Sequence, residues 1–202
     1  YTIGAVLTIM AFFFTSDALR TFGNYTLTIA LAAAEACLLV GLAFAPSLYI
    51  AVPLFELHHA IVPIILFNID ILTEERIGKR EGVTGARRGM QLAIVSLGYA
   101  LAILVSGFLV GAGQSRFALV YLASAACMFL FCWYVHQKFK TFPDPAYTDL
   151  NVIAALRHFL FTHDFRFVFL AHFLLQLFFA WMVIYMPLYL STVVGFAWNE
   201  IG

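Results

Sequence analysis

Long apolar runs separated by short polar segments dominate the chain and determine its predicted elements. A helix needs roughly 20 mostly apolar residues to cross the hydrocarbon core of a bilayer. Six runs reach or approach that length, approximately Tyr1–Thr15, Tyr25–Ala45, Leu48–Leu72, Gly89–Ala112, Phe117–Val135 and Phe167–Leu190. The strands of a membrane barrel would alternate over about ten residues, whereas these runs are longer and apolar on every side. The pattern predicts an all-α, polytopic membrane protein with six transmembrane helices.

The composition agrees with this prediction and excludes several soluble classes. Of the 202 residues, 63% are apolar and only 11% are charged, which is too few to coat a globular surface. The chain has 11 Lys and Arg residues and 11 Asp and Glu residues, so it lacks the excess positive charge that nucleic-acid binding needs. The 3 cysteines lie inside apolar runs without a CxxC pair, which predicts small buried side chains rather than a disulfide framework.

The positively charged residues predict how the spans are oriented. All Lys and Arg residues but one fall in alternate connections, at residues 16–24, 73–88 and 136–166. The exception, Arg116, lies in a connection on the opposite side. Because short loops rich in Lys and Arg stay on the cytoplasmic side, we expect these three connections to be cytoplasmic.

The longest connection contains a predicted surface helix. Pro143 and Pro145 exclude a helix interior, and Asp149 can cap a helix that follows them. The apolar residues of this helix fall on one face, at Val152, Ile153, Leu156, Phe159 and Leu160. The helix either lies in the membrane interface or packs only on protein.

Both ends of the chain point to a longer protein. The first run is short, begins without Met and follows no charged leader, so it is not a signal peptide. The chain stops at Gly202, shortly after the sixth run. We expect the chain to be an internal piece of a larger membrane protein.

Five spans, a long cytoplasmic linker with a surface helix and a sixth span follow the order found in the middle of a twelve-helix transporter. In the first connection Asp17, Arg20 and Gly23 match acidic, basic and glycine positions of a known motif, although the spacing is stretched and the basic tail is absent. The chain resembles the major facilitator superfamily from its second helix to just past its seventh. In that family this turn is a cytoplasmic gate that holds one conformation, which the resemblance implies for Asp17 and Arg20.

Two further segments support the resemblance. Gly98, Gly107 and Gly111 are spaced like the opening of the glycine motif of antiporter members, although Ala112 stands where the family has proline. Small residues let helices approach closely in lipid, so these glycines are predicted to pack helices. Residues 185–202 look like the end of the seventh family helix and its turn toward the eighth.

The resemblance also implies the domain organisation and the function. Residues 1–135 would form the N-terminal six-helix half without its first helix, 136–166 the cytoplasmic linker, and 167–202 the first helix of the C-terminal half and the start of the loop that follows. Family members are secondary transporters that move a small solute by alternating access. We expect such a transporter in the plasma (inner) membrane, with the bilayer, a solute and protons as its partners and with no cofactor, metal, nucleic acid or enzymatic activity.

Ionisable side chains inside the spans are candidates for function, because a charge at mid-bilayer costs on the order of 3 kcal/mol or more. Glu56 and His59 lie on one stripe of their helix, together with Asp70 near its inner end. By family analogy this stripe faces the central cavity. His58 lies about 100° away from the stripe.

Glu35, His172 and Gln176 complete the candidates for solute binding or proton coupling. His172 and Gln176 share a face of the last span at positions i and i+4. Glu35 lies roughly 16 Å from the outer end of its helix and Glu56 roughly 12 Å, so the two are at similar depth. A carboxyl beside another carboxyl or an imidazole at low dielectric can bind and release a proton at cellular pH. The alternative for Glu35 is a protonated group that only hydrogen-bonds a neighbouring helix.

Charged groups at the cytoplasmic ends of the spans are predicted to pair with one another rather than to bind solute. Asp70 and Glu74 are expected to pair with Arg20, Arg87 or Arg88. These residues are therefore candidates for a cytoplasmic gate.

Two other functions are open. His58, His59 and His172 with Glu56 could ligate a metal in a membrane-embedded redox enzyme, although the chain holds only one Glu-x-x-His arm of the carboxylate-bridged type. A member of the same family could also act as a sensor without transporting anything. No P-loop or HExxH motif supports nucleotide binding or zinc-protease chemistry.

Overall fold

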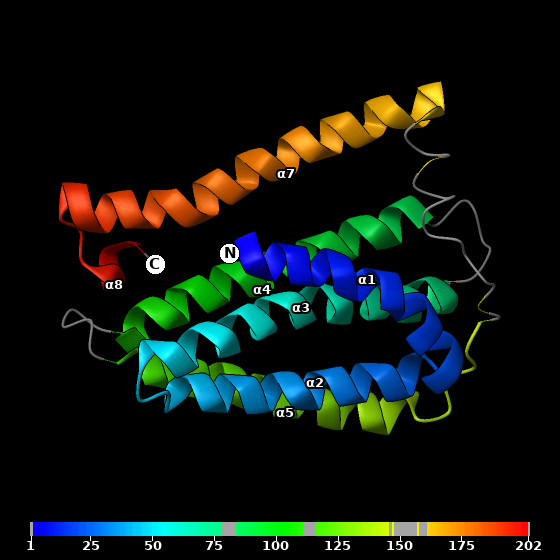
Figure 1. The fold of residues 1–202 in the computed structure, drawn as a ribbon, viewed down its shortest axis with the longest axis horizontal. Helices are drawn as coiled ribbons and strands as arrows, with labels where there is room; N and C mark the ends of the chain where they lie inside the picture. Colours follow the sequence, from blue (N-terminus) through cyan, green and yellow to red (C-terminus); the bar gives the residue numbers. More distant parts are fainter. Residues whose placement is uncertain are drawn as a thin grey trace. The chain divides into compact units, whose positions relative to one another are not determined.

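The computed structural model describes residues 2–77, 84–110, 116–145, 147, 157 and 161–201. Helices account for almost all of these residues, and no strand occurs among them (Figure 1). The elements are α1 (Thr2–Phe22), α2 (Asn24–Ala43), α3 (Leu48–Ile77), α4 (Thr84–Val110), α5 (Phe117–Phe139), α7 (His163–Tyr189), the π-helical turn η2 (Leu190–Val194) and α8 (Trp198–Ile201).

Six of the described helices are long and apolar enough to cross a membrane. They are α1 to α5 and α7, the last continuing through η2, and each coincides with one of the predicted apolar runs. The prediction of an all-α, polytopic membrane fold is confirmed. The predicted surface helix at 149–160 lies outside the described residues, apart from Arg157.

The first predicted connection, at 16–24, is wrong in its extent. Helix α1 continues to Phe22, and Gly23 alone separates it from α2. Gly23 has a φ of +76°, a left-handed conformation that other residues adopt only with strain. Asp17 and Arg20 therefore lie on the last turns of α1 rather than in a loop. The apolar run ends at Thr15, but the polar side chains that follow it are compatible with a helix that continues into water.

Contacts along the chain divide it into two compact units. The first comprises Tyr1–Ala102 and Arg116–Thr148, and the second comprises Ile103–Ser115 and Asp149–Gly202. The predicted division at 135 and 166 rests on the family's topology and stays a prediction.

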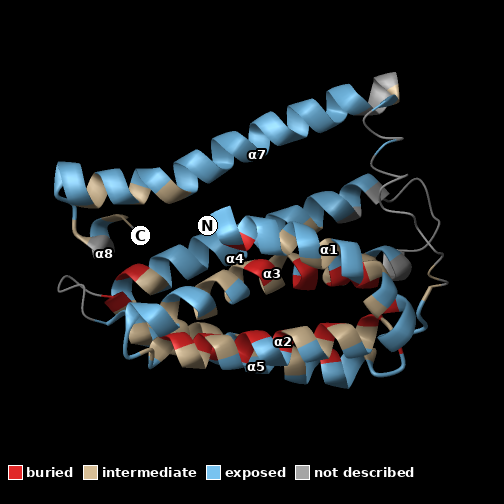
Figure 2. Cartoon of the chain, in the orientation of Figure 1, coloured by how far each residue is buried: buried red, intermediate tan, exposed pale blue. Residues whose placement is uncertain are grey.

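In the first unit, α2 is the central element. It packs against α5 and α3, and α3 packs against α1 (Figures 1 and 2). Ala32 and Ala36 on α2 are fully buried, as is nearly all of Ala125 on α5. Because lipid tails are as apolar as the side chains, close packing of small residues holds such helices together more than a hydrophobic driving force does.

In the second unit, α7 presents an apolar surface along its whole length. No residue in its most hydrophobic window is buried. Pro187 lies inside the helix near its end, and the π-helical turn η2 follows and stops at Gly195, whose φ is +84°. A proline removes one backbone donor from a helix, so the irregular turn lies where the regular hydrogen-bond pattern is weakest.

Packing on α2 gives a direct stability prediction. Replacing buried Ala36 with Leu should destabilise the protein by about 1–3 kcal/mol, because no space exists for three extra carbons. Replacing Ala34 with Leu, at an exposed position on the same helix, is the matched control and should have little effect. Thermal unfolding in detergent measures both, and equal melting temperatures for the two variants would contradict the packing.

The orientation of the spans gives a second prediction. In a variant without native cysteines, Ser47→Cys between α2 and α3 and Gly85→Cys at the start of α4 should react with membrane-impermeant maleimide from opposite sides. The positive-inside pattern assigns the Gly85 side to the cytoplasm. Labelling of both positions from the same side in sealed vesicles would contradict a transmembrane α3.

Candidate functional site

A carboxyl and an imidazole meet between α2 and α3, deep within the first unit. A hydrogen bond joins Glu35 Oε1 to His58 Nδ1. The Glu35 side chain is 2% exposed, whereas that of His58 is 27% exposed. Glu35 Oε2 is buried and has no hydrogen-bond partner among the described residues. The pair therefore connects a fully enclosed carboxyl to a partly accessible ring.

The position of Glu35 follows from the buried face of α2. Asn24, Thr28 and Leu39 are also buried. Steps of four or seven residues separate each of them from the next buried position in the series that includes Glu35, which places them on the side of the helix that carries Glu35. His58 lies on α3, which packs against α2. His58 lies about 100° around α3 from the face that carries His59, and this rotation turns His58 toward α2.

Aromatic packing supports the two neighbouring histidines of α3. The ring of Phe55 stacks on His59 with a centroid distance of 6.4 Å and an interplanar angle of 10°. The same ring lies 5.9 Å from the His58 ring at 48°. Phe55 thus restricts both imidazoles, although only that of His58 bonds to Glu35.

Glu56 and His59 lie against α1. A Cβ atom added to Gly4 would be 2.6 Å from Glu56 Oε2 and 2.7 Å from His59 Cδ2. The Thr8 hydroxyl donates hydrogen bonds to the carbonyl oxygens of Gly4 at 2.9 Å and His59 at 3.4 Å. A helix residue without a side chain is therefore what allows α1 to approach Glu56 and His59. The role of both residues in a solute cavity stays a prediction.

The remaining described candidates within the membrane lie on α7 and α4. His172 and Gln176 lie on α7 in the second unit, and both are exposed. Gly98 is exposed, with no atom within 4 Å of a Cβ added to it, whereas Gly107 is buried. Gly111 lies outside the described residues.

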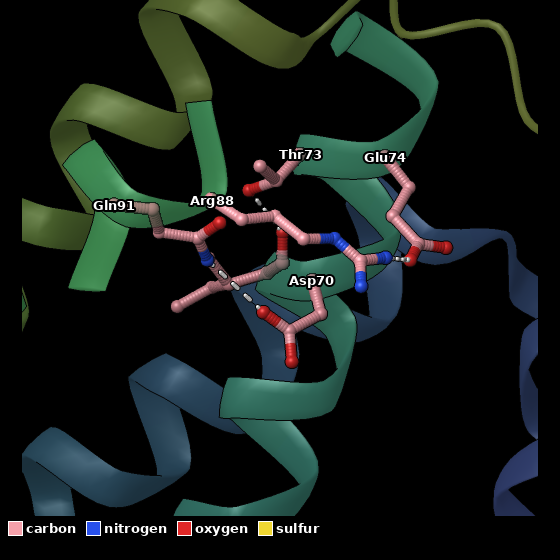
Figure 3. Close-up of polar contacts among 6 residues, drawn as sticks. Asp70, Thr73, Glu74, Arg88 and Gln91 are labelled. Atoms are coloured by element: carbon pink, nitrogen blue, oxygen red, sulfur yellow. Dashed lines mark hydrogen bonds and ion pairs between the residues drawn. The ribbon is translucent and has the colours of Figure 1, made fainter. Parts of the chain in front are cut away.

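Polar contacts join the ends of α3 and α4 (Figure 3). Arg88 donates to Glu74 at 2.8 Å, one of the pairings expected from the sequence. Gln91 Nε2 donates to Asp70 Oδ1 at 3.2 Å, so this amide occupies the place predicted for an arginine. The side chains of Arg88 and Glu74 are more than half exposed, and such pairs contribute about 0–1 kcal/mol each.

The other gate candidates contact each other within α1. Arg20 lies 3.6 Å from Asp17 at positions i and i+3, and both side chains are more than half exposed. The side chain of Arg87 lies outside the described residues. Their gating role stays a prediction.

Contacts that no sequence pattern predicts lie at the N-terminal end of α2. The backbone N–H of Asn24 donates to Asp144 Oδ1 at 2.8 Å, and the Asn24 side-chain amide donates to the Asn68 carbonyl at 3.0 Å. Asn24 and Asn68 are fully buried. The Pro-Asp-Pro sequence at 143–145 indicated a break after α5, but no periodicity relates it to a helix 120 positions earlier.

No protein-family model, curated protein or solved structure matches the chain. The described residues contain no group of three or more His, Cys, Asp or Glu side chains arranged to hold a metal ion. The metal-enzyme hypothesis, which needs His58, His59, His172 and Glu56 together, thus gains no support from the described geometry. The class that the structure establishes is a multi-pass, all-α membrane protein.

The approach of α1 to Glu56 and His59 can be tested with one methyl group. Gly4→Ala should lower stability, although alanine is the better helix former, because its Cβ would overlap both side chains. Gly98→Ala, where nothing lies within 4 Å, should leave stability unchanged or raise it by up to about 1 kcal/mol. Melting temperatures in detergent measure the difference, and a Gly4→Ala protein as stable as Gly98→Ala would refute the close approach.

Proposed function

We propose that the chain belongs to a secondary active transporter of the major facilitator type, which moves a small solute by alternating access and couples it to protons. The observation that carries this proposal is the enclosed Glu35 carboxyl bonded to His58 between two membrane-spanning helices. An ionisable group in a span is expensive, and such groups mark ion and substrate pathways.

The chemistry of the pair suits a reversible proton site. With one proton shared between Glu35 and His58 the pair is neutral overall, whether as carboxylic acid and imidazole or as carboxylate and imidazolium. Loss of that proton leaves a net negative charge at low dielectric, where charge is costly. A conformation that admits water to the pair would stabilise the charged form, so proton occupancy can shift the balance between conformations.

Two features of the first unit would allow its helices to move against one another. Small buried residues on α2 allow close contact, and Gly4 allows α1 to lie directly on α3. The pairs at the ends of α3 and α4 are exposed and weak, which suits contacts that form and break during a cycle. The topological resemblance to the family supplies the proposed mode of transport and the cytoplasmic side.

The proposal assigns different roles to Glu35 and Glu56. Glu35 would carry the coupling proton, since His58 is bonded to it. Glu56 and His59 on the adjoining face of α3, and His172 and Gln176 on α7, remain the candidates for contact with solute. A sensor of the same fold would keep the proton site but show no flux.

Flux measurements on the full-length protein in proteoliposomes test this function. A panel of sugars, amino acids, organic acids and organic cations is offered under an imposed pH gradient, with a trapped pH dye reporting proton movement. We expect at least one solute to move with protons. Glu35→Gln should reduce gradient-driven flux by tenfold or more while solute exchange without a gradient persists, because the solute contacts are intact.

Two further variants serve as comparisons for Glu35→Gln in that experiment. Glu200→Gln changes an exposed carboxyl on α8 that belongs to none of the named sites, and it should retain wild-type coupling. Glu56→Gln distinguishes the two carboxyls, since it should alter solute affinity rather than the proton requirement. Wild-type protein that moves no solute would defeat the transporter proposal, and gradient-driven flux that Glu35→Gln leaves intact would defeat the coupling role of Glu35.

A further inference from the structure

The cytoplasmic end of α2 lacks a capping side chain of its own. The residue before the helix is Gly23, which has no side chain to accept a hydrogen bond from the first turn. Unsatisfied N–H groups at this position are normally met by a Ser, Thr, Asp or Asn at the N-cap. Here the acceptor is the carboxylate of Asp144, from the segment that follows α5.

Two observations show that this contact is specific, and the helix dipole favours it as well. Asp144 Oδ1 accepts from the Asn24 N–H at 2.8 Å and from the Tyr147 hydroxyl at 2.9 Å. A Cβ atom on Gly23 would overlap Asp144 Oδ2, so only glycine leaves room for the carboxylate. A carboxylate at a helix N-terminus also interacts favourably with the helix dipole.

The same turn of α2 is tied to α3. The Asn24 side chain donates to the Asn68 carbonyl at 3.0 Å, and both asparagines are fully buried. Eleven positions further along α2, or about 16 Å, Glu35 bonds to His58 of α3. The position of Asn24 against α3 therefore helps to set the position of Glu35 against His58.

We propose that Asp144 is a positioning residue, through which the segment after α5 holds α2 in register with α3 and thereby sets the proton affinity of the Glu35–His58 pair. This inference rests on the proposed role of that pair as the proton site. It extends that role, because it makes the connecting segment between the two halves part of the proton-coupling machinery. Asp144 itself does not bind the coupling proton.

The first measurement tests the contact itself in the full-length protein in lipid nanodiscs. Asp144→Ala should speed hydrogen–deuterium exchange in the first turn of α2 by about fivefold or more, because the Asn24 amide loses its acceptor. Tyr147→Phe, which removes a donor to Asp144 but leaves the capping bond, is the matched control and should change exchange little. Unchanged exchange in Asp144→Ala would overturn the proposal.

The second measurement tests positioning of the proton site. The infrared band of the protonated Glu35 carboxyl, assigned by its loss in Glu35→Gln, is titrated against pH. Asp144→Ala should move the titration midpoint by half a pH unit or more, about a threefold change in proton affinity. Asp144→Asn keeps an oxygen acceptor and should stay close to wild type.

Gly23→Ala provides an independent route to the same displacement. Its added Cβ should push Asp144 away and shift the midpoint as Asp144→Ala does, and the two changes together should shift it no further than one alone. Fully additive shifts would mean that Gly23 acts by backbone strain and not through Asp144, which contradicts the proposal.

The outcomes separate this inference from the proposed function. A wild-type Glu35 band that does not titrate defeats the proton-site role itself, and this inference with it. A band that titrates identically in wild type and Asp144→Ala defeats only the positioning role of Asp144. Equal shifts in Asp144→Asn and Asp144→Ala would show that its charge, rather than its hold on α2, is what matters, and would likewise overturn the positioning role.

Discussion

The arrangement of the first unit depends on the cost of enclosing the Glu35 carboxyl within a membrane. A lone carboxylate there would cost several kcal/mol, so the side chain needs a partner from another helix. His58 is that partner, and their bond fixes both the rotation and the height of α2 against α3. A shift of one residue would turn Glu35 by about 100° toward lipid or α5. The Asn24 bond to α3 enforces the same register at the other end of the interface.

The pattern of buried and exposed residues around this interface suits a protein surrounded by lipid rather than by water. Most buried positions of α2 are small or polar, including Ala32, Ala36, Thr28 and Glu35, although Leu39 and Leu42 are buried too. Large apolar side chains are exposed along the other spans. In hydrocarbon these exposed side chains are in a matching solvent. Specific contacts must then come from close approach of backbones and from hydrogen bonds between helices. No residue of the most hydrophobic window of α7 is buried, and large apolar side chains are exposed along that helix.

The spans could be predicted from the sequence because bilayer thickness fixes the length of an apolar helix. The contacts between spans could not be predicted from the sequence, since the rotation and register of each helix depend on which small residues meet. The sequence marks Glu35 as an ionisable residue inside a span, and the structure buries it, but the stripe of Glu56 and His59 does not indicate that His58 is its partner. The bond of Asp144 to Asn24 joins positions 120 residues apart and leaves no local pattern. The end of α1 was misplaced for another reason, since polar residues mark the membrane boundary and not the helix boundary.

Two kinds of polar contact in the first unit differ in how strongly they can influence a conformational equilibrium. The pairs of Arg88 with Glu74 and Arg20 with Asp17 lie in water, where the solvent replaces a broken contact and each pair contributes little. In the Glu35–His58 pair the carboxyl is enclosed and the imidazole is only partly exposed, so solvent cannot readily replace the bond between them. A ligand shifts an equilibrium only by its difference in affinity for the two states. For a proton, that difference is largest where one state encloses the site and the other admits water. In the proposed transporter, coupling is therefore assigned to the Glu35–His58 pair, and the exposed pairs would adjust only which conformation predominates at rest.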